Sequence, residues 1–120
     1  MKNLESFCVS EEASVQDAIS SIQVNESRCV IVMGEGSKVV GVFSEGDVLR
    51  AVLAGHDMHT PLKKLLNPTF KYLQSEDFAG AVKLFRRGIT LVPVVDNDFA
   101  LRSVMTLQEF LEGLELGDSG

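Results

Sequence analysis

The sequence predicts an α/β fold in which two similar halves, each with the order helix, strand, strand, helix, face each other as a pseudo-twofold pair. Two observations lead to this prediction: helical hydrophobic spacing alternates with short β-rich runs, and the order of these signals repeats halfway along the 120 residues. About 60 residues alone bury only a marginal fraction of their surface, whereas two related halves can share one core. We therefore expect one domain built from two repeats.

The duplication can be followed residue by residue. One offset joins the predicted strands and the helix starts that follow them, which a chance similarity would not maintain, and the leading helices match at an offset of 63, as in Val15 and Phe78. Four pairs of similar residues are separated by the same 62 positions: Val30 and Val92, Val42 and Val104, Ser44 and Thr106, and Asp47 and Glu109.

The first half begins with a capping-box pattern at Ser14 and Asp17, followed by apolar residues at helical spacing. Two β-rich runs around a Gly-rich turn then predict a hairpin, and Gly55 is a typical residue to end the helix that follows. The expected elements are a helix of about three turns that starts after Ser14 and includes Ile22, strands over 28–33 and 39–43, and a helix from Ser44 to Gly55.

The second half predicts a helix, two strands and a helix over residues 77–87, 91–95, 101–105 and 106–114. Pro93 lacks a backbone N–H, so its strand should lie at a sheet edge or leave a gap that something else can approach. Residues 70–73 are expected to form a short leading strand, and Thr60 with Pro61 predicts a helix start in an ordered linker.

Composition excludes several functions. Eleven Lys and Arg are scattered among 17 acidic residues and the pI is about 4.8, which disfavours a nucleic acid polymer or an anionic membrane surface as partner. A membrane span or a signal peptide is not evident, so a cytoplasmic location is expected. Cys8 and Cys29 lie in apolar surroundings and are interpreted as small buried hydrophobes.

The segment from Gly41 to Arg50, with sequence GVFSEGDVLR, resembles the end of a CBS motif: glycine, apolar, any residue, Ser or Thr, two residues, then Asp leading into a helix. Residues 91–96 resemble the second strand of that motif. The chain is thus similar to a tandem CBS pair, or Bateman module. The implied organisation is CBS repeat 1 at residues 4–56, a linker at 57–67, CBS repeat 2 at 68–116 and a flexible tail at 117–120, each repeat with a short leading strand.

The resemblance implies a regulatory module that binds AMP, ADP, ATP or another adenosyl compound such as S-adenosylmethionine between the repeats, and that rearranges to control a fused or associated enzyme. In such modules the hydroxyl residue contacts phosphate or ribose, and the carboxylate accepts the ribose hydroxyls. The implied nucleotide-binding residues are Gly41, Ser44 and Asp47 with Arg28 in the first repeat, and Thr90, Thr106 and Glu109 in the second. No cofactor is required by this interpretation.

The residues themselves support two interpretations. A carboxylate can accept both hydroxyls of a cis-diol, and a helix start attracts an anionic phosphate. The same spacing of Ser44 with Asp47, and of Thr106 with Glu109, also satisfies a capping box that needs no ligand. In the second repeat Ser103 replaces the glycine equivalent to Gly41, so the cleft of Glu109 is expected to be weaker, different in ligand, or empty.

An alternative function remains open at this point. CBS pairs also act as dimerisation modules without ligand, and a homodimer is expected under either interpretation. The run from Asp47 to Asp57, followed by Pro61 and by Asn67 with Pro68, is similar to CBS pairs that precede sugar-nucleotide transferases, so the chain is also interpreted as a fragment of a longer protein of that kind. An enzyme is not expected, because the sequence lacks a constellation of acid, base and nucleophile.

Three further groups have structural explanations that compete with functional ones. His56 and His59 flank Asp57 and suit a polar linker better than a metal site, which needs more ligands. Phe70 and Tyr72 would either stack on a base or pack in the core, and core packing is favoured. Arg86 and Arg87 are expected to complement the dipole of their helix instead of binding phosphate.

Overall fold

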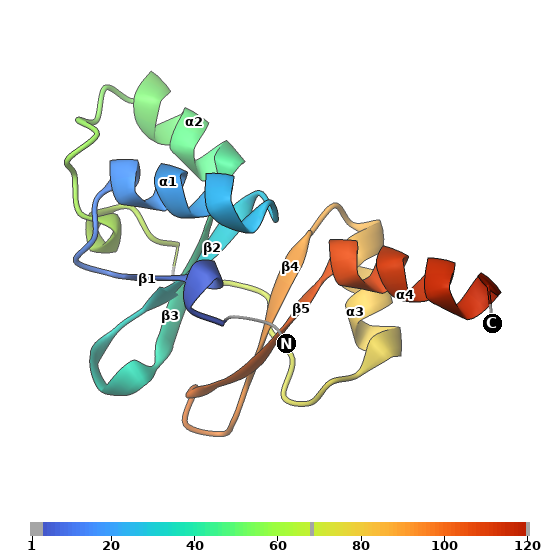
Figure 1. The fold of residues 1–120 in the computed structure, drawn as a ribbon. Coiled ribbons are helices and arrows are strands. Elements are labelled where there is room, and N and C mark those ends of the chain that lie inside the picture. Colours follow the sequence, from blue (N-terminus) through green and yellow to red (C-terminus); the bar gives the residue numbers. More distant parts are fainter. Residues whose placement is uncertain (1–3, 68, 120) are drawn as a thin grey trace.

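The computed structural model describes residues 4–67 and 69–119, with side chains through residue 114. Two small sheets lie side by side, each carrying a pair of helices (Figure 1). The first sheet has the order β1 (Cys8–Ser10), β2 (Cys29–Met33), β3 (Val39–Ser44), and the second pairs β4 (Leu91–Val95) with β5 (Leu101–Thr106). The α/β fold of two repeats is confirmed.

The helices occupy equivalent places in the two repeats (Figure 1). In the first repeat, α1 (Val15–Asn25) and α2 (Glu45–Leu53) lie together on one face of the sheet. In the second, α3 (Phe78–Arg86) and α4 (Leu107–Ser119) do the same. The capping box predicted at Ser14 is present: its hydroxyl accepts from the N–H of Asp17 at 3.1 Å, and Asp17 accepts from the N–H of Ser14 at 3.0 Å.

Strand register repeats exactly as the duplication predicts. The hairpin of β2 and β3 has a bulge between Val32 and Met33, and the hairpin of β4 and β5 has one between Val94 and Val95, 62 residues later. Backbone at the hairpin tips matches too, since Ser37 and Phe99 both have positive φ, 59° and 64°. The two halves therefore share backbone detail that goes beyond their side-chain pattern.

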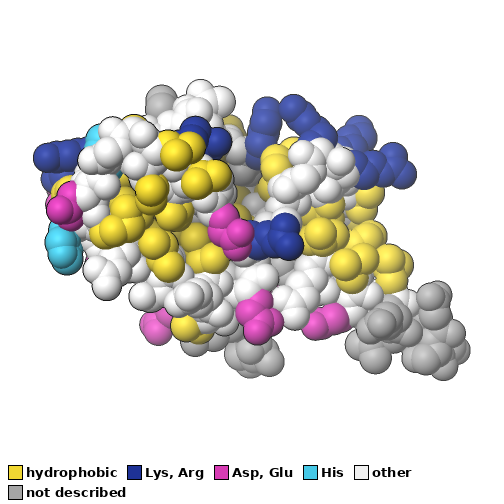
Figure 2. Space-filling view, turned by 90° about the horizontal axis from the view of Figure 1, so that it is seen from above, with side chains coloured by type: hydrophobic (Ala, Val, Ile, Leu, Met, Phe, Trp, Pro, Cys, Tyr) yellow, Lys and Arg dark blue, Asp and Glu magenta, His cyan; other side chains and the backbone are white. Residues whose placement is uncertain are grey.

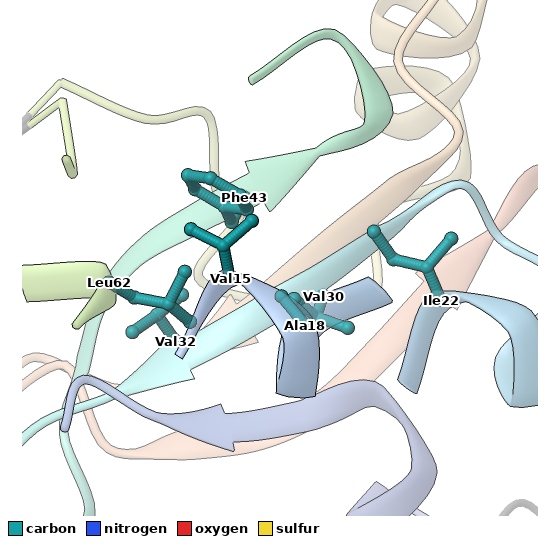
Figure 3. Close-up of a cluster of buried hydrophobic side chains, with 7 residues drawn as sticks. All are labelled: Val15, Ala18, Ile22, Val30, Val32, Phe43 and Leu62. Carbon is teal, nitrogen blue, oxygen red and sulfur yellow. The ribbon is translucent and has the colours of Figure 1, made fainter. Parts of the chain in front are cut away.

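A core inside the first repeat joins its helices to its sheet (Figure 3). Side chains from α1 point at the buried face of β2 and β3, so the helical and the strand periodicities meet there. The buried members are Val15, Ala18, Ile22, Val30, Val32, Phe43 and Leu62.

A second core is shared between the repeats. Cys29, Ile31 and Val39 of the first sheet pack against the second sheet, whose buried members are Leu91, Val95 and Val104. The hairpins also join at their tips, where the N–H of Val39 donates to the carbonyl of Phe99 at 2.8 Å. Neither sheet could cover this face with residues of its own repeat, which agrees with the expectation of one common core.

The predicted strand at residues 70–73 is absent, and this expectation is corrected. Leu73 alone bridges β4: its N–H donates to the carbonyl of Pro93 at 3.0 Å, and its carbonyl accepts from Val95 at 2.9 Å. The next step of a parallel ladder needs an N–H from Pro93, which has none, so pairing stops there. β4 is thus an edge strand, as expected, and the Pro93 side chain is fully buried.

The linker is ordered and lies on the first repeat. Pro61 precedes a 3₁₀ helix at Leu62–Lys64, and the side chain of Leu62 is fully buried in the first core. Backbone bonds fasten the segment, with the N–H of Leu62 donating to Ala13 at 2.8 Å and the N–H of Val15 to Thr60 at 3.1 Å. The expected helix start at Pro61 is confirmed, although it opens a single 3₁₀ turn.

At the other end of the chain, α4 continues to Ser119. Residues 117–119 are therefore helical where a loose tail was predicted, because no proline stops the helix, and Gly120 lies outside the described residues. Of the helices in the described part of the chain, none has the length and apolar character that crossing a membrane requires.

Candidate functional site

Ser44 and Asp47 form a complete capping box at the start of α2. Asp47 donates its N–H to the Ser44 hydroxyl oxygen at 3.2 Å, and the Asp47 Oδ2 atom accepts from the Ser44 N–H at 2.8 Å and from the Ser44 hydroxyl at 3.0 Å. The capping box therefore occupies the Oδ2 atom of Asp47 with two hydrogen bonds. The other oxygen, Oδ1, accepts from the guanidinium of Arg50, one turn along the helix.

The first cleft lies between the repeats and has a volume of about 440 Å³. Its lining joins the start of β2, the start of α2 and the segment before β4, so three chain segments from both repeats meet there. Three predicted nucleotide-binding residues line it together: Arg28, Ser44 and Thr90. Asp47 and Gly41 are not in this lining.

The second cleft, of about 470 Å³, is the counterpart of the first under the 62-residue offset. Glu26, Leu107 and Gln108 take the places of Gly88, Glu45 and Gly46, and both clefts share Arg28 and Thr90. The shared pair lies where the two repeats meet. The pseudo-twofold relation of the repeats therefore extends to their clefts.

Arg28 and Thr90 also hold the backbone together. The carbonyl of Arg28 accepts from the N–H of Glu45 at 3.0 Å, and the carbonyl of Thr90 accepts from Leu107 at 2.9 Å, so each residue fastens a strand start to the following helix start. The Thr90 hydroxyl donates to the carbonyl of Ser27 across the repeats. Arg28 has φ of 64°, a left-handed conformation that is uncommon for a residue other than glycine.

Gly41 serves packing in this structure. A Cβ added there would lie 3.2 Å from Cδ2 of Leu66, so the linker side chain fills the space above the glycine. Its counterpart Ser103 instead donates its hydroxyl to Glu76 Oε1 at 2.9 Å. The repeats thus differ at this position in packing partner as well as in side chain.

Thr106 and Glu109 begin α4 in the same way as Ser44 and Asp47 begin α2. The N–H of Glu109 donates to the Thr106 hydroxyl oxygen at 3.1 Å, and that hydroxyl donates to Glu109 Oε1 at 3.2 Å. Both residues line a third cleft of about 400 Å³ together with Asn25 and Glu112. Thr106 is itself buried, so its hydroxyl is less open to a ligand than that of the half-buried Ser44.

Cys29 lies in the lining of the first cleft but is buried beneath its surface. Burial raises the pKa of the Cys29 thiol to about 12, and it also raises the pKa of the half-buried Cys8. Thiols with raised pKa stay protonated at neutral pH and are poor nucleophiles and poor metal ligands. The interpretation of Cys29 as a buried small hydrophobe is confirmed.

The other candidate groups are two aromatic residues, two histidines and two arginines. Phe70 and Tyr72 pack with Phe99 in an aromatic cluster, with ring centroids 5.6 Å apart for Phe70 and Tyr72 and 5.1 Å for Tyr72 and Phe99. His56 and His59 belong to no group of three or more potential metal ligands among the residues that the structure describes. Arg86 ends α3 and Arg87 caps it, the positions that a helix dipole favours for cations.

Comparison with known proteins supports the family assignment. The family model of the CBS domain matches residues 2–54. The chain contains a CBS domain. The whole described fold is that of CBS domain pairs: it superimposes on the CBS domains of a transcriptional regulator from Streptococcus pneumoniae with a TM-score of 0.74, at 20% identity and 92% coverage of both chains. The resemblance to a tandem CBS module is therefore confirmed.

A second solved structure carries a ligand. A CBS domain protein from Pyrobaculum aerophilum, complexed with AMP, has a TM-score of 0.70 and 22% identity, covering 98% of this chain and 99% of that one. Among curated relatives, the arabinose 5-phosphate isomerase GutQ of Salmonella typhi is 34% identical over 101 residues, or 82% of this chain. The CBS module spans about a third, 32%, of the length of that isomerase.

One residue of the site was missed by sequence reasoning. Arg50 donates to Oδ1 of Asp47 and so occupies the carboxylate oxygen that the capping box does not use. Its spacing of three residues from Asp47 on one helix was visible in the sequence and is a recognised signal for an ion pair. The pairing itself depends on the side-chain conformation, which the spacing does not give.

Proposed function

We propose that this CBS module is a regulatory sensor that binds an adenosine nucleotide in the first cleft. The observation that carries the proposal is the meeting of Ser44, Arg28 and Thr90 in one lining between the repeats. Together they supply a helix N-terminus for phosphate, a guanidinium, and hydroxyl groups. The AMP complex of a protein with the same fold supports an adenosine ligand.

Asp47 fits the role of ribose acceptor. It lies one helical turn from Ser44, its side chain is 29% exposed, and its Oδ1 atom is held only by an exposed guanidinium on its own helix. A charged acceptor that bonds ribose hydroxyls, together with a phosphate at the helix start, could bring the binding free energy to about −8 kcal/mol, the level of a micromolar site. Binding would favour one arrangement of the repeats by its differential affinity for the two arrangements.

The enzyme under control is proposed from the relatives. Since the CBS module spans about a third of an arabinose 5-phosphate isomerase, we infer control of a fused or associated sugar-phosphate isomerase. This replaces the sugar-nucleotide transferase of the sequence interpretation as the favoured class. Residues 4–56 and 68–116 would be the two repeats of the sensor.

Calorimetric titration with AMP, ADP, ATP and S-adenosylmethionine tests the proposal, and the chain supplies its own control. Ser14 and Ser44 begin equivalent capping boxes, but only Ser44 lines the first cleft. Ser14→Ala and Ser44→Ala should each lower the free energy of unfolding by about 1 kcal/mol. Only Ser44→Ala should also weaken nucleotide binding, and Asp47→Ala should abolish it.

Two results would overturn the proposal. One is the absence of heat with all four compounds up to about millimolar, where binding contributes only about −4 kcal/mol. The other is equal loss of affinity in Ser14→Ala and Ser44→Ala, which would mean that both act through stability alone.

A dimerisation module is the second candidate, and a specific observation favours it. The same helical positions are exposed and apolar in both repeats: Leu49 and Leu111 are 58% and 51% exposed, and Val52 and Leu114 are 50% and 51% exposed. Seen from above, hydrophobic side chains gather on both halves of one face (Figure 2). Sedimentation equilibrium of the wild type and of Leu49→Glu tests this candidate, since a homodimer through this face should become a monomer in the variant.

A further inference from the structure

The two repeats differ in charge at one helical position, three residues after the carboxylate of each capping pair. Arg50 of α2 follows Asp47 by three residues, and Glu112 of α4 follows Glu109 by three residues, 62 positions later. The guanidinium of Arg50 contacts Asp47, whereas Glu112 accepts from the amide of Gln108 at 3.3 Å and adds a second carboxylate to its helix face. The pseudo-twofold relation therefore places a cation beside one carboxylate and an anion beside the other.

Arg50 lies next to the first cleft as well as next to Asp47. A Cβ built on Gly46, which lines the cleft, would be 3.6 Å from Nη1 of Arg50 and 3.6 Å from the Ser44 hydroxyl oxygen. The guanidinium thus lies beside the start of α2 and next to Gly46, although Arg50 itself is not part of the cleft lining. Arg28, directly before β2, is itself part of the cleft lining.

The ion pair between Arg50 and Asp47 costs little free energy to break. The Arg50 side chain is 71% exposed, and exposed ion pairs within one helix are weak in water. Oδ2 of Asp47 is committed to the Ser44 N–H and hydroxyl, so a ribose hydroxyl must approach Oδ1, the atom that Arg50 holds. A nucleoside alone would displace the guanidinium into water, whereas a nucleotide offers it a phosphate in exchange.

We propose that Arg50 is the specificity residue of the first cleft: ribose takes Oδ1 of Asp47, and the released guanidinium binds the ligand's phosphate, so that the cleft selects nucleotides over nucleosides. This inference rests on the proposed nucleotide function. The counterpart position in the second repeat, Glu112, would repel a phosphate, so this selection belongs to the first cleft alone.

Titration of adenosine, AMP and ATP against the whole chain and three variants tests the inference. The wild type should bind AMP at least about tenfold more tightly than adenosine, since Arg and phosphate form charge-assisted, often bidentate hydrogen bonds. Arg50→Gln should reduce the preference to about threefold or less, through weaker binding of AMP. Arg50→Lys should keep part of the preference, because it keeps the charge but loses the planar fork.

Arg102→Gln is the matched control. Arg102 is exposed on β5 of the other repeat, near Asp96, and unlike Arg50 it does not pair with Asp47; its removal changes the net charge by the same amount. It should leave the preference for AMP unchanged. Thermal melting of each variant confirms that the fold is intact.

The outcomes separate this inference from the proposed function. If neither adenosine nor any nucleotide binds, the nucleotide function is wrong and the inference is wrong with it. If AMP binds but Arg50→Gln keeps the wild-type preference over adenosine, the nucleotide function stands and the role of Arg50 is overturned. An equal loss of preference in Arg102→Gln also overturns it, since net charge alone would then explain the selection.

Discussion

At the scale of single residues, two carboxylates are held in the ionised form by backbone N–H groups. Asp96 at the turn between β4 and β5 accepts from Ala100 at 3.0 Å and from Asp98 at 2.8 Å, and these bonds lower its pKa from 3.8, that of Ala100 most. Asp17 in the cap of α1 accepts from the Ser14 N–H, which lowers its pKa in the same direction. Both carboxylates stabilise the fold most in their charged form.

Acid should therefore weaken the fold through these groups. Because the folded pKa lies below the unfolded value of 3.8, their contribution is present above about pH 4 and is lost as the pH falls through the lowered folded pKa. Urea midpoints measured from pH 7 to about pH 2.5 should fall steeply in the wild type and less steeply in Asp96→Asn, which keeps the acceptor but cannot titrate. Asp98→Asn, at the same turn, is the control and should follow the wild type; an equally steep fall in Asp96→Asn would contradict the prediction.

Residue types and spacing were enough to predict part of the candidate site. Ser44, Arg28 and Thr90 share one lining because the repeat pattern fixes where each strand and helix begins. The sequence could not give the left-handed backbone of Arg28, since no local rule favours that conformation for arginine. Nor could it show that the space at Gly41 is filled by Leu66, a contact between segments far apart in the chain.

At the scale of elements, the strands of both hairpins were predicted to within a residue because apolar runs and turn residues punctuate them clearly. The predictions that failed concern the chain outside the duplicated hairpins. Residues 70–73 have strand-like side chains, but pairing depends on donors in the neighbouring strand, and Pro93 withholds one. The end of α4 has no decisive stop signal, so its length could not be fixed from local residues.

The linker contributes to the stability of the first repeat, and substitutions at two leucines test this contribution. Leu62 is fully buried in the first core, so Leu62→Ala should lower the free energy of unfolding by about 2–5 kcal/mol through lost burial and a cavity. Leu53 ends α2 and is 77% exposed, so Leu53→Ala should change it by about 0.5 kcal/mol or less. Chemical denaturation of both variants provides the measurement; similar values for the two would mean that the linker does not contribute to the core.

At the scale of the whole molecule, the core between the sheets makes the repeats depend on each other. Ile31 from β2 and Val95 and Val104 from the second repeat lie in one buried cluster, so unfolding either repeat exposes the apolar face of the other. A chain of this size with such a shared core should unfold in a single cooperative step.

The natural composition provides a probe for this prediction. The chain has one tyrosine and no tryptophan, and Tyr72 packs on Phe99 in the second repeat, so its fluorescence reports on that repeat, while circular dichroism reports on both. The two urea transitions should coincide, and Ile31→Ala, a change in the first repeat, should shift both by the same amount. Separate midpoints, or a shift confined to circular dichroism, would show that the repeats unfold independently.

The pseudo-twofold arrangement of the clefts has a consequence for signalling capacity. In a dimer of identical single repeats, every substitution appears at both clefts, so the two states with one bound ligand are the same. Such a dimer has three levels of occupancy: no ligand, one ligand or two. Joining the repeats in one chain removes that constraint, and here it has allowed arginine at position 50 and glutamate at position 112. Two inequivalent clefts that each bound a ligand would have four distinguishable states, so under the proposed function a single small domain would register the ratio of two metabolites where a symmetric one would register only an amount.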